Sequence, residues 1–165
     1  MKRLLALDLA AKTGIAIQRA DGEVVTGTEL FLKTLKPGAR WVRFQMWLSN
    51  LCEFENPEII IFEEPFIHMQ HRTGLGISYG FKALLEMVAA QRNVRCYGIA
   101  PTQFKAFATG HGNASKEQMA VFARSMGWDL TDDNAIDARF LLFYAQDRLE
   151  RVQKALAHSA TGKTR

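Results

Sequence analysis

The order of apolar segments predicts an α/β protein built on a mixed five-stranded sheet with helices on both faces. Residues 4–8, 14–18 and 23–32 are short apolar or alternating runs separated by turn signals, as expected for an antiparallel meander. Two further apolar runs, at residues 58–62 and 94–99, each follow a segment with helical spacing. A meander followed by alternating helices and strands is typical of an α/β sandwich.

Turn and helix-breaking residues divide the first half of the chain. Residues 20–22 read Ala-Asp-Gly, a hairpin signal, and residues 36–38 read Lys-Pro-Gly, which ends the meander. The helix expected next ends at Asn56-Pro57. Its large apolar residues recur at helical spacing and are predicted to be core, or a dimer face, without a chemical role: Trp41, Phe44, Trp47, Leu48 and Leu51.

The second half of the chain predicts a loop followed by helices and one strand. Residues 66–76 contain His68, His71 and two glycines and are expected to form a mobile loop. Because crossovers between parallel strands are right-handed, strand 58–62 is expected beside and parallel to the first strand. Helices are predicted at residues 79–92, at residues 101–109, from Ser115 with Gln118 completing a capping box, and from Asp133 into the 150s.

Length and composition indicate one soluble globular domain. The chain has 165 residues, of which 48% are hydrophobic and 23% charged. We expect residues 1–157 to form the domain and residues 158–165 a flexible basic tail. Cys52 and Cys96 lack metal-ligand spacing, which favours a reduced cytoplasmic setting. No apolar run is long enough to span a bilayer, so no membrane partner is expected.

The net charge of +4 is unevenly distributed. Between Pro65 and Lys116 six cations face the single acid Glu86, which gives this segment +5 and leaves −1 for the remainder. A basic middle segment beside acidic clusters suggests a polyanionic partner such as nucleic acid. An ordinary solvated surface with uneven charge explains the same count, and composition alone does not separate the two interpretations.

Asp8 is the unexpected residue of the first strand. A carboxylate among apolar residues is costly unless a cation, a donor cluster or a metal compensates it. One interpretation is that Asp8 caps the following turn through the backbone amides of Lys12 and Thr13. The other involves Glu63, which ends the fourth strand. If the two strands are neighbours, the carboxylates of Asp8 and Glu63 converge at one end of the sheet.

A second group of acids begins the last predicted helix. Asp133 lies four residues before Asp137 and Asn134 three residues before it, so all three can share one helix face. Asp132 is better interpreted as the N-cap. Asp137 lies among apolar residues that should pack on the sheet, where a purely structural carboxylate is costly.

Carboxylates gathered from such distant positions indicate a metal site, because they repel one another unless divalent cations neutralise them. Oxygen-only ligands favour Mg²⁺, with Mn²⁺ able to substitute, over zinc. Two such ions roughly 4 Å apart form a clamp for in-line phosphodiester displacement. The sequence therefore predicts a two-ion nuclease site.

Four motifs in the chain together resemble one family. They are Leu5-Ala-Leu-Asp-Leu-Ala-Ala-Lys-Thr-Gly14, Ile61-Phe-Glu-Glu-Pro-Phe66, Ala100-Pro-Thr-Gln-Phe-Lys105 through Gly110-His-Gly-Asn-Ala-Ser-Lys116-Glu-Gln118, and Asp132-Asp-Asn-Ala-Ile-Asp-Ala138. In this order they cover nearly the whole chain and resemble the RuvC-type Holliday-junction resolvases of the ribonuclease H-like superfamily, most closely the compact phage and prophage forms. The resemblance implies a ribonuclease H-like fold.

The resemblance also implies roles for individual residues. Asp8, Glu63 and Asp137 match metal-binding carboxylates. The fourth ligand is Asp133, which we favour, or Asn134, because the family commonly has an acid where this chain has Asn134.

DNA contacts are implied as well. The implied residues are Phe66, which can stack on bases of an opened junction, Lys105 and Lys116, which match lysines near the scissile phosphate, and Arg72, a backbone contact from the loop. Lys116 is counted among the catalytic residues for this reason. Weaker candidates are His68, His71 and His111, and Glu64 is expected at the surface or behind the ligands rather than as a ligand itself.

The expected protein is a homodimeric, Mg²⁺-dependent endonuclease that nicks paired strands of four-way or other branched DNA in a bacterial host cell. A two-fold dimer suits a junction because each active site meets an equivalent strand. An RNA-processing nuclease of the same superfamily and a non-catalytic protein that binds branched nucleic acid remain alternatives. An actin-type ATP-binding fold needs two domains, and 165 residues are too few for it.

Overall fold

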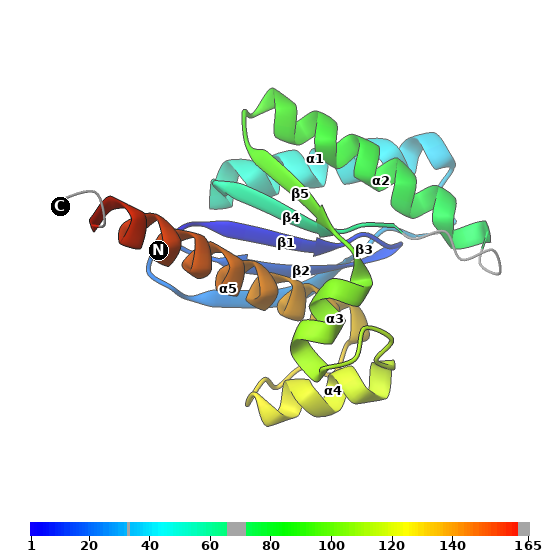
Figure 1. The fold of residues 1–165 in the computed structure, drawn as a ribbon. Helices are drawn as coiled ribbons and strands as arrows, with labels where there is room; N and C mark the ends of the chain where they lie inside the picture. The colour runs from blue at the N-terminus through cyan, green and yellow to red at the C-terminus, as the bar shows by residue number, and fades with distance from the viewer. Residues whose placement is uncertain (33, 66–71, 162–165) are drawn as a thin grey trace.

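The computed structural model describes residues 1–32, 34–65 and 72–161. Five strands and five helices follow one another along this part of the chain (Figure 1). The elements in order are β1 (Leu4–Asp8), β2 (Lys12–Gln18), β3 (Val24–Leu30), α1 (Pro37–Glu55), β4 (Ile59–Glu63), α2 (Arg72–Gln91), β5 (Arg95–Ile99), α3 (Pro101–Thr109), α4 (Lys116–Ser125) and α5 (Asp133–Thr161). The predicted α/β architecture with a mixed five-stranded sheet is therefore confirmed.

The strands lie in the order β3-β2-β1-β4-β5. The first three form the predicted antiparallel meander, and β4 pairs with β1 in parallel, as the crossover rule predicts. Strand β5 extends the parallel half. Because β1 and β4 run in the same direction and are neighbours, Asp8 and Glu63 lie at the same end of the sheet.

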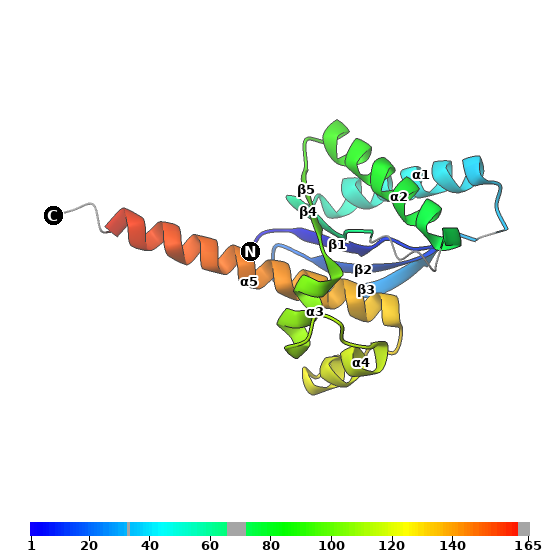
Figure 2. The same cartoon turned by 45° about the vertical axis from the view of Figure 1, so that its right-hand side comes forward.

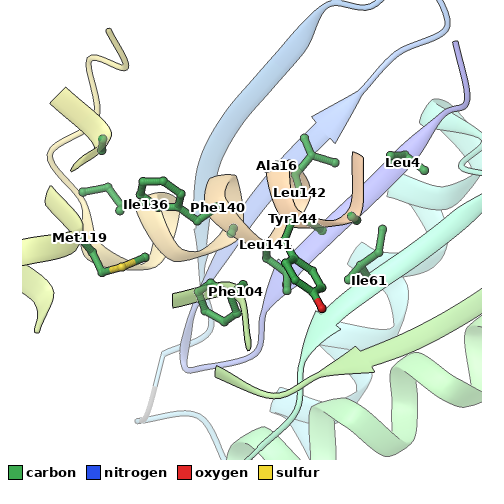
Figure 3. Packing of buried hydrophobic residues seen from close by; sticks show 14 of the residues in the cluster. Leu4, Ala16, Ile61, Phe104, Met119, Ile136, Phe140, Leu141, Leu142 and Tyr144 are labelled. Carbon is green, nitrogen blue, oxygen red and sulfur yellow. The ribbon is translucent and has the colours of Figure 1, made fainter. Parts of the chain in front are cut away.

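The sheet separates two hydrophobic cores. Helices α1 and α2 cover one face, while α5 covers the other with α3 and α4 beside it (Figures 1 and 2). Along β1, Leu4 and Ala6 contribute to the α5-side core, and Leu5 and Leu7 to the other. Figure 3 shows the α5-side core, which Phe104 and Met119 of α3 and α4 close on its outer side.

This alternation decides where the acids point. Successive residues of a strand face opposite sides of a sheet, so Asp8 follows Leu4 and Ala6 onto the α5 side. Glu63 follows Ile59 and Ile61 onto the same side. The two carboxylates therefore share an end and a face of the sheet, directly under α5.

Aromatic packing joins α1 to α2. Phe44 stacks on Phe81 with ring centroids 3.9 Å apart, and Phe31 meets both rings edge-on. Of the residues predicted as the apolar stripe of the first helix, Phe44 and Leu48 are fully buried in this core, and the other three are partly buried and pack against it. Helix α1 begins with Pro37 at its first position and ends at Asn56, whose φ of 45° is left-handed.

The predicted loop at residues 66–76 is partly wrong. Helix α2 begins at Arg72, so residues 72–76 are helical, and the remainder, with Phe66, His68 and His71, lies outside the described residues. Gly74 and Gly76 looked like helix breakers, but a glycine costs only about 1 kcal/mol in a helix. Burial of the Phe81, Leu85 and Val88 stripe further along the helix outweighs that cost.

Helix α5 continues to Thr161, four residues into the expected tail. Its C-terminal half extends beyond the sheet (Figure 2). Flexibility of the tail stays a prediction, since residues 162–165 lie outside the described part of the chain. No helix among the described residues is both long and apolar enough to cross a membrane.

Candidate metal centre

Three acids from distant parts of the chain meet at the end of the sheet. Asp8 ends β1, Glu63 ends β4 and Asp137 lies in the second turn of α5. Each offers a carboxylate oxygen, and the three oxygens all lie within 4.8 Å of one another. We call Asp8, Glu63 and Asp137 the carboxylate triad. The predicted convergence of these three side chains is thus observed.

Burial makes the carboxylate triad resist ionisation. Desolvation, followed by the charges of Glu63 and Asp137, raises the pKa of Asp8 well above its ordinary value. Desolvation and the charge of Asp137 raise the pKa of Glu63 to about 7. The pKa of Asp137 is also raised, mainly by desolvation. Three partly buried carboxylates this close together therefore repel one another unless a proton or a cation neutralises them.

The donor set fits a hard divalent cation. All three groups supply only oxygen, and their oxygens are close enough to share one ion. A positive ion between them would remove the repulsion that raises the pKa values. Within the described part of the chain, the site therefore offers the oxygen ligands that a hard divalent cation prefers and none of the nitrogen or sulfur ligands typical of zinc.

Two lysines line the edge of the carboxylate triad. Lys105 comes from α3 and Lys116 is the first residue of α4. Both ammonium groups act on Asp8 and Asp137, whose pKa values they lower against the larger effect of burial. The Nζ atom of Lys116 lies 3.0 Å from Oδ2 of Asp133. Ser115 holds the start of α4 in a capping box with Gln118, as the sequence predicts.

The remaining acids at the start of α5 have other partners. Asp132 is the predicted N-cap: its Oδ1 accepts hydrogen bonds from the backbone amides of Asn134 and Ala135 at 3.0 and 3.2 Å. Asp133 is half-exposed, pairs with Lys116 and does not belong to the carboxylate triad. The side-chain amide of Asn134 donates to the backbone carbonyl of Lys12. A fourth ligand from Asp133 or Asn134 stays a prediction.

The turn after β1 is closed without Asp8. The hydroxyl of Thr13 donates to the carbonyl of Ala10 at 2.8 Å, and Phe31 donates its backbone amide to Ala11 at 2.7 Å. The carboxylate of Asp8 faces Glu63 and Asp137. Of the two interpretations of Asp8, convergence with distant acids describes the structure.

Glu64 lies on the opposite side of the sheet from Glu63. Its carboxylate pairs with Lys82 of α2, and its backbone amide donates to Ile99 at 2.9 Å. A Cβ at Gly98 would lie 2.1 Å from Oε2 of Glu64, so the glycine makes room for this carboxylate. Glu64 is thus not part of the carboxylate triad, in line with its predicted place away from the ligands.

Only some of the residues predicted to contact DNA lie in the described part of the chain. Lys105 and Lys116 lie at the carboxylate triad, and His111 is exposed in the loop between α3 and α4. Phe66, His68, His71 and the side chain of Arg72 lie outside the described residues. Of the other cations in the basic segment, Lys82 pairs with Glu64 and Arg92 with Glu53. The excess positive charge of this segment is therefore partly neutralised away from the site.

Sequence reasoning missed one feature of the site. Gly14 lies opposite Asp8 in the β1–β2 ladder and directly under the backbone of α5. A glycine inside a strand is a known sign of close backbone approach, but it does not identify the approaching segment. The partner, Asn134, lies 120 residues further along the chain.

Fold and site together define a class of protein: an α/β domain of the ribonuclease H-like kind with clustered acids at the end of its central strands. Comparison with known proteins shows which proteins the chain is similar to. No family model matches the chain. Crossover junction endodeoxyribonuclease RuvC of Thermus thermophilus is 31% identical over 70 residues, which is 42% of this chain and 42% of that protein. RuvC of Caldicellulosiruptor saccharolyticus is 25% identical over 93 residues, 56% of this chain and 55% of that protein.

Solved structures extend the likeness to most of the fold. T. thermophilus RuvC in complex with Holliday junction substrate has a TM-score of 0.69 at 18% identity, covering 87% of this chain and 92% of that one. The yeast mitochondrial Holliday junction resolvase Ydc2 has a TM-score of 0.56 at 16% identity, covering 85% and 75%.

These findings confirm the predicted resemblance to RuvC-type resolvases and the ribonuclease H-like fold. In sequence, the matched segments span only about half the length of the curated relatives. The compact phage or prophage form stays a prediction.

Proposed function

We propose that this protein is a metal-dependent endonuclease that resolves Holliday junctions or other branched DNA by paired nicking. The observation that carries the proposal is the carboxylate triad, whose oxygens lie within 4.8 Å of one another beside Lys105 and Lys116. The similarity to proteins named as crossover junction endodeoxyribonucleases supports the choice of substrate.

The proposed cofactor is Mg²⁺, replaceable by Mn²⁺, with two ions per active site. Asp8, Glu63 and Asp137 would hold the metal, and Asp133 is the proposed further ligand because it borders the triad from the first turn of α5. Bound metal would supply an activated water and a positive charge for the leaving oxygen.

The chain's own cations have a separate proposed task. Lys105 and Lys116 lie where a phosphate approaching the carboxylate triad would carry its negative charge. Their ammonium groups can hold that phosphate and offset the charge that develops during displacement. Phe66 and Arg72 are proposed to contact the bases and the backbone of an opened junction.

Paired nicking requires two sites, so we propose a homodimer acting in the cytoplasm of a bacterial host cell. A two-fold axis through both protomers would present equivalent strands of a four-way junction to equivalent sites. Size-exclusion chromatography with light scattering, with and without junction DNA, tests this part. A monomer that stays monomeric on the junction contradicts paired nicking.

The central experiment is cleavage of a labelled mobile four-way junction with and without Mg²⁺. Asp8→Asn and Glu63→Gln are expected to lower the cleavage rate at least 100-fold while junction binding is retained. Glu58→Gln is the matched control, because Glu58 lies at the other end of β4, where it pairs with Arg3 on the surface. Wild-type cleavage by Asp8→Asn or Glu63→Gln contradicts the assignment.

Two alternatives predict different results in the same experiment. An RNA-processing nuclease would cut structured RNA in preference to junction DNA, so both substrates are offered side by side. A non-catalytic binding protein would retain the junction but bind neither Mg²⁺ nor Mn²⁺. The shared acid-containing first strand does not separate these proteins, whereas Lys105 and Lys116 favour the DNA resolvases.

A further inference from the structure

Gly14 marks the point where α5 touches the sheet. In the β1–β2 ladder Gly14 is paired with Asp8, and paired residues project from the same face about 5 Å apart. A Cβ built on Gly14 would lie 1.9 Å from the carbonyl oxygen of Asn134 and 2.4 Å from its carbonyl carbon. Both atoms are backbone and cannot rotate away. The first turn of α5 therefore occupies the space of a side chain directly beside Asp8.

Two polar contacts hold the start of α5 against β2 at this point. The side-chain amide of Asn134 donates to the carbonyl of Lys12, two residues before Gly14. The ammonium group of Lys12 pairs with Oδ2 of Asp132, whose Oδ1 caps the helix. We call Lys12, Gly14, Asp132 and Asn134 the β2–α5 clamp. Its four residues join the start of one strand to the start of the helix that carries Asp137.

We infer that the β2–α5 clamp positions Asp137 for metal binding, and that Asn134 acts through this clamp rather than as a metal ligand. The inference rests on the proposed function for the role of the metal. Asp137 is one helical turn beyond Asn134, so the height of Asn134 above Gly14 fixes the height of Asp137 above Asp8 and Glu63. Donation from the amide nitrogen of Asn134 to the carbonyl of Lys12 fixes this side chain against β2, and the Asn134→Ala experiment below distinguishes that role from ligation through the amide oxygen.

The neighbouring strand offers a glycine that makes no such contact. Gly27, in the adjacent strand β3, meets nothing within 4 Å of a Cβ built on it. Gly14→Ala has to move the backbone of Asn134 from 1.9 Å to an ordinary contact of at least 3.4 Å. Displacement on this scale takes Asp137 away from the other two carboxylates and breaks up a triad whose oxygens all lie within 4.8 Å of one another.

The test compares Gly14→Ala with Gly27→Ala as the matched control. Mn²⁺ binding to the DNA-free protein is measured by calorimetry, after thermal unfolding has shown that each variant is folded. Gly14→Ala is expected to bind Mn²⁺ at least 10-fold more weakly than wild type, and Gly27→Ala within about 2-fold. A folded Gly14→Ala protein with wild-type affinity overturns the inference.

Asn134→Ala separates a positioning residue from a ligand and serves as the second variant if Gly14→Ala does not fold. A clamp residue supports the metal-free protein, so its removal lowers the melting temperature in EDTA as well as the Mn²⁺ affinity. Loss of affinity with an unchanged melting temperature in EDTA would show a ligand and overturn this assignment of Asn134.

A crystal structure of metal-free Gly14→Ala provides a measurement that does not depend on the proposed function. The separation between the carboxylates of Asp8 and Asp137 is expected to widen, and an unchanged separation overturns the inference. If the wild-type protein binds no Mn²⁺, the proposed metal centre is wrong. The distance between the carboxylates of Asp8 and Asp137 in Gly14→Ala still tests whether the β2–α5 clamp positions Asp137.

Discussion

Glu63 and Glu64 are chemically alike and adjacent, yet the sheet gives them different environments. Glu63 faces α5 and is crowded against Asp8 and Asp137, whereas Glu64 faces α2 and pairs with Lys82. The difference follows from the two-residue period of a strand. A pair of acids in the sequence therefore yields one member of the carboxylate triad and one ordinary ion pair.

Glu63→Gln is expected to stabilise the metal-free protein. At pH 8 the carboxylate is ionised in the folded state although burial raises its pKa from 4.5 to about 7. Keeping it ionised there opposes folding, and a neutral amide of the same shape removes that cost. The free energy of unfolding in EDTA at pH 8 should rise by roughly 1–3 kcal/mol.

Chemical unfolding of wild type and Glu63→Gln in EDTA measures this difference. Glu58→Gln is the control, since it removes the charge that pairs with Arg3 at the surface, while its amide oxygen can still accept from the backbone amide of Arg3, and it should lower stability by less than about 1 kcal/mol. If Glu63→Gln lowers stability as Glu58→Gln does, the carboxylate triad is not strained in the metal-free state.

Among the helices, α4 has its capping residue next to a lysine that lies at the carboxylate triad. Its first residue, Lys116, lies at the carboxylate triad, and the residue before it, Ser115, caps the helix. Fraying of this helix end would release the lysine from its place. A capping residue far from the acids in sequence thus supports a cation that faces them.

Ser115→Ala should lower the free energy of unfolding by about 1 kcal/mol, because one backbone amide of the first turn of α4 loses its acceptor. Ser125→Ala is the control at the last residue of the same helix, where the hydroxyl donates only to the carbonyl of Phe122. Its expected cost is below about 0.5 kcal/mol. Equal costs in urea titrations of the two variants would contradict a specific capping role.

The elements also show what the sequence could reveal. The apolar runs and the right-handed crossover predicted β1 beside β4 and so brought Asp8 to Glu63. The start of α2 was missed because Gly74 and Gly76 are local signals, while burial of Phe81 and Leu85 against α1 decides the helix. The close approach at Gly14 was not predicted, because its partner, Asn134, is identified only once the chain is folded.

For the whole molecule, the carboxylate triad connects the two central strands of the sheet to α5. Asp8 and Glu63 come from the parallel pair β1 and β4, and Asp137 comes from the helix that packs across β2 and β1. Folding therefore assembles the site and also creates its electrostatic repulsion. Metal binding should relieve that repulsion, so the metal and the stability of the domain are expected to be linked.

The melting temperature of the domain is expected to depend on pH, and bound metal is expected to reverse the direction of that dependence. The folded-state pKa of Glu63, about 7, exceeds its ordinary value of 4.5 because of burial, so its protonated form favours folding. That contribution is fully present below about pH 4.5 and is lost as the pH rises through about 7. Melting temperatures in EDTA should therefore fall between pH 5 and pH 8, whereas saturating Mn²⁺, which needs ionised carboxylates, should raise them most at pH 8. In EDTA, Glu63→Gln should show a smaller decrease in melting temperature between pH 5 and pH 8 than wild type. An equally large decrease in that variant would mean that other groups cause the effect.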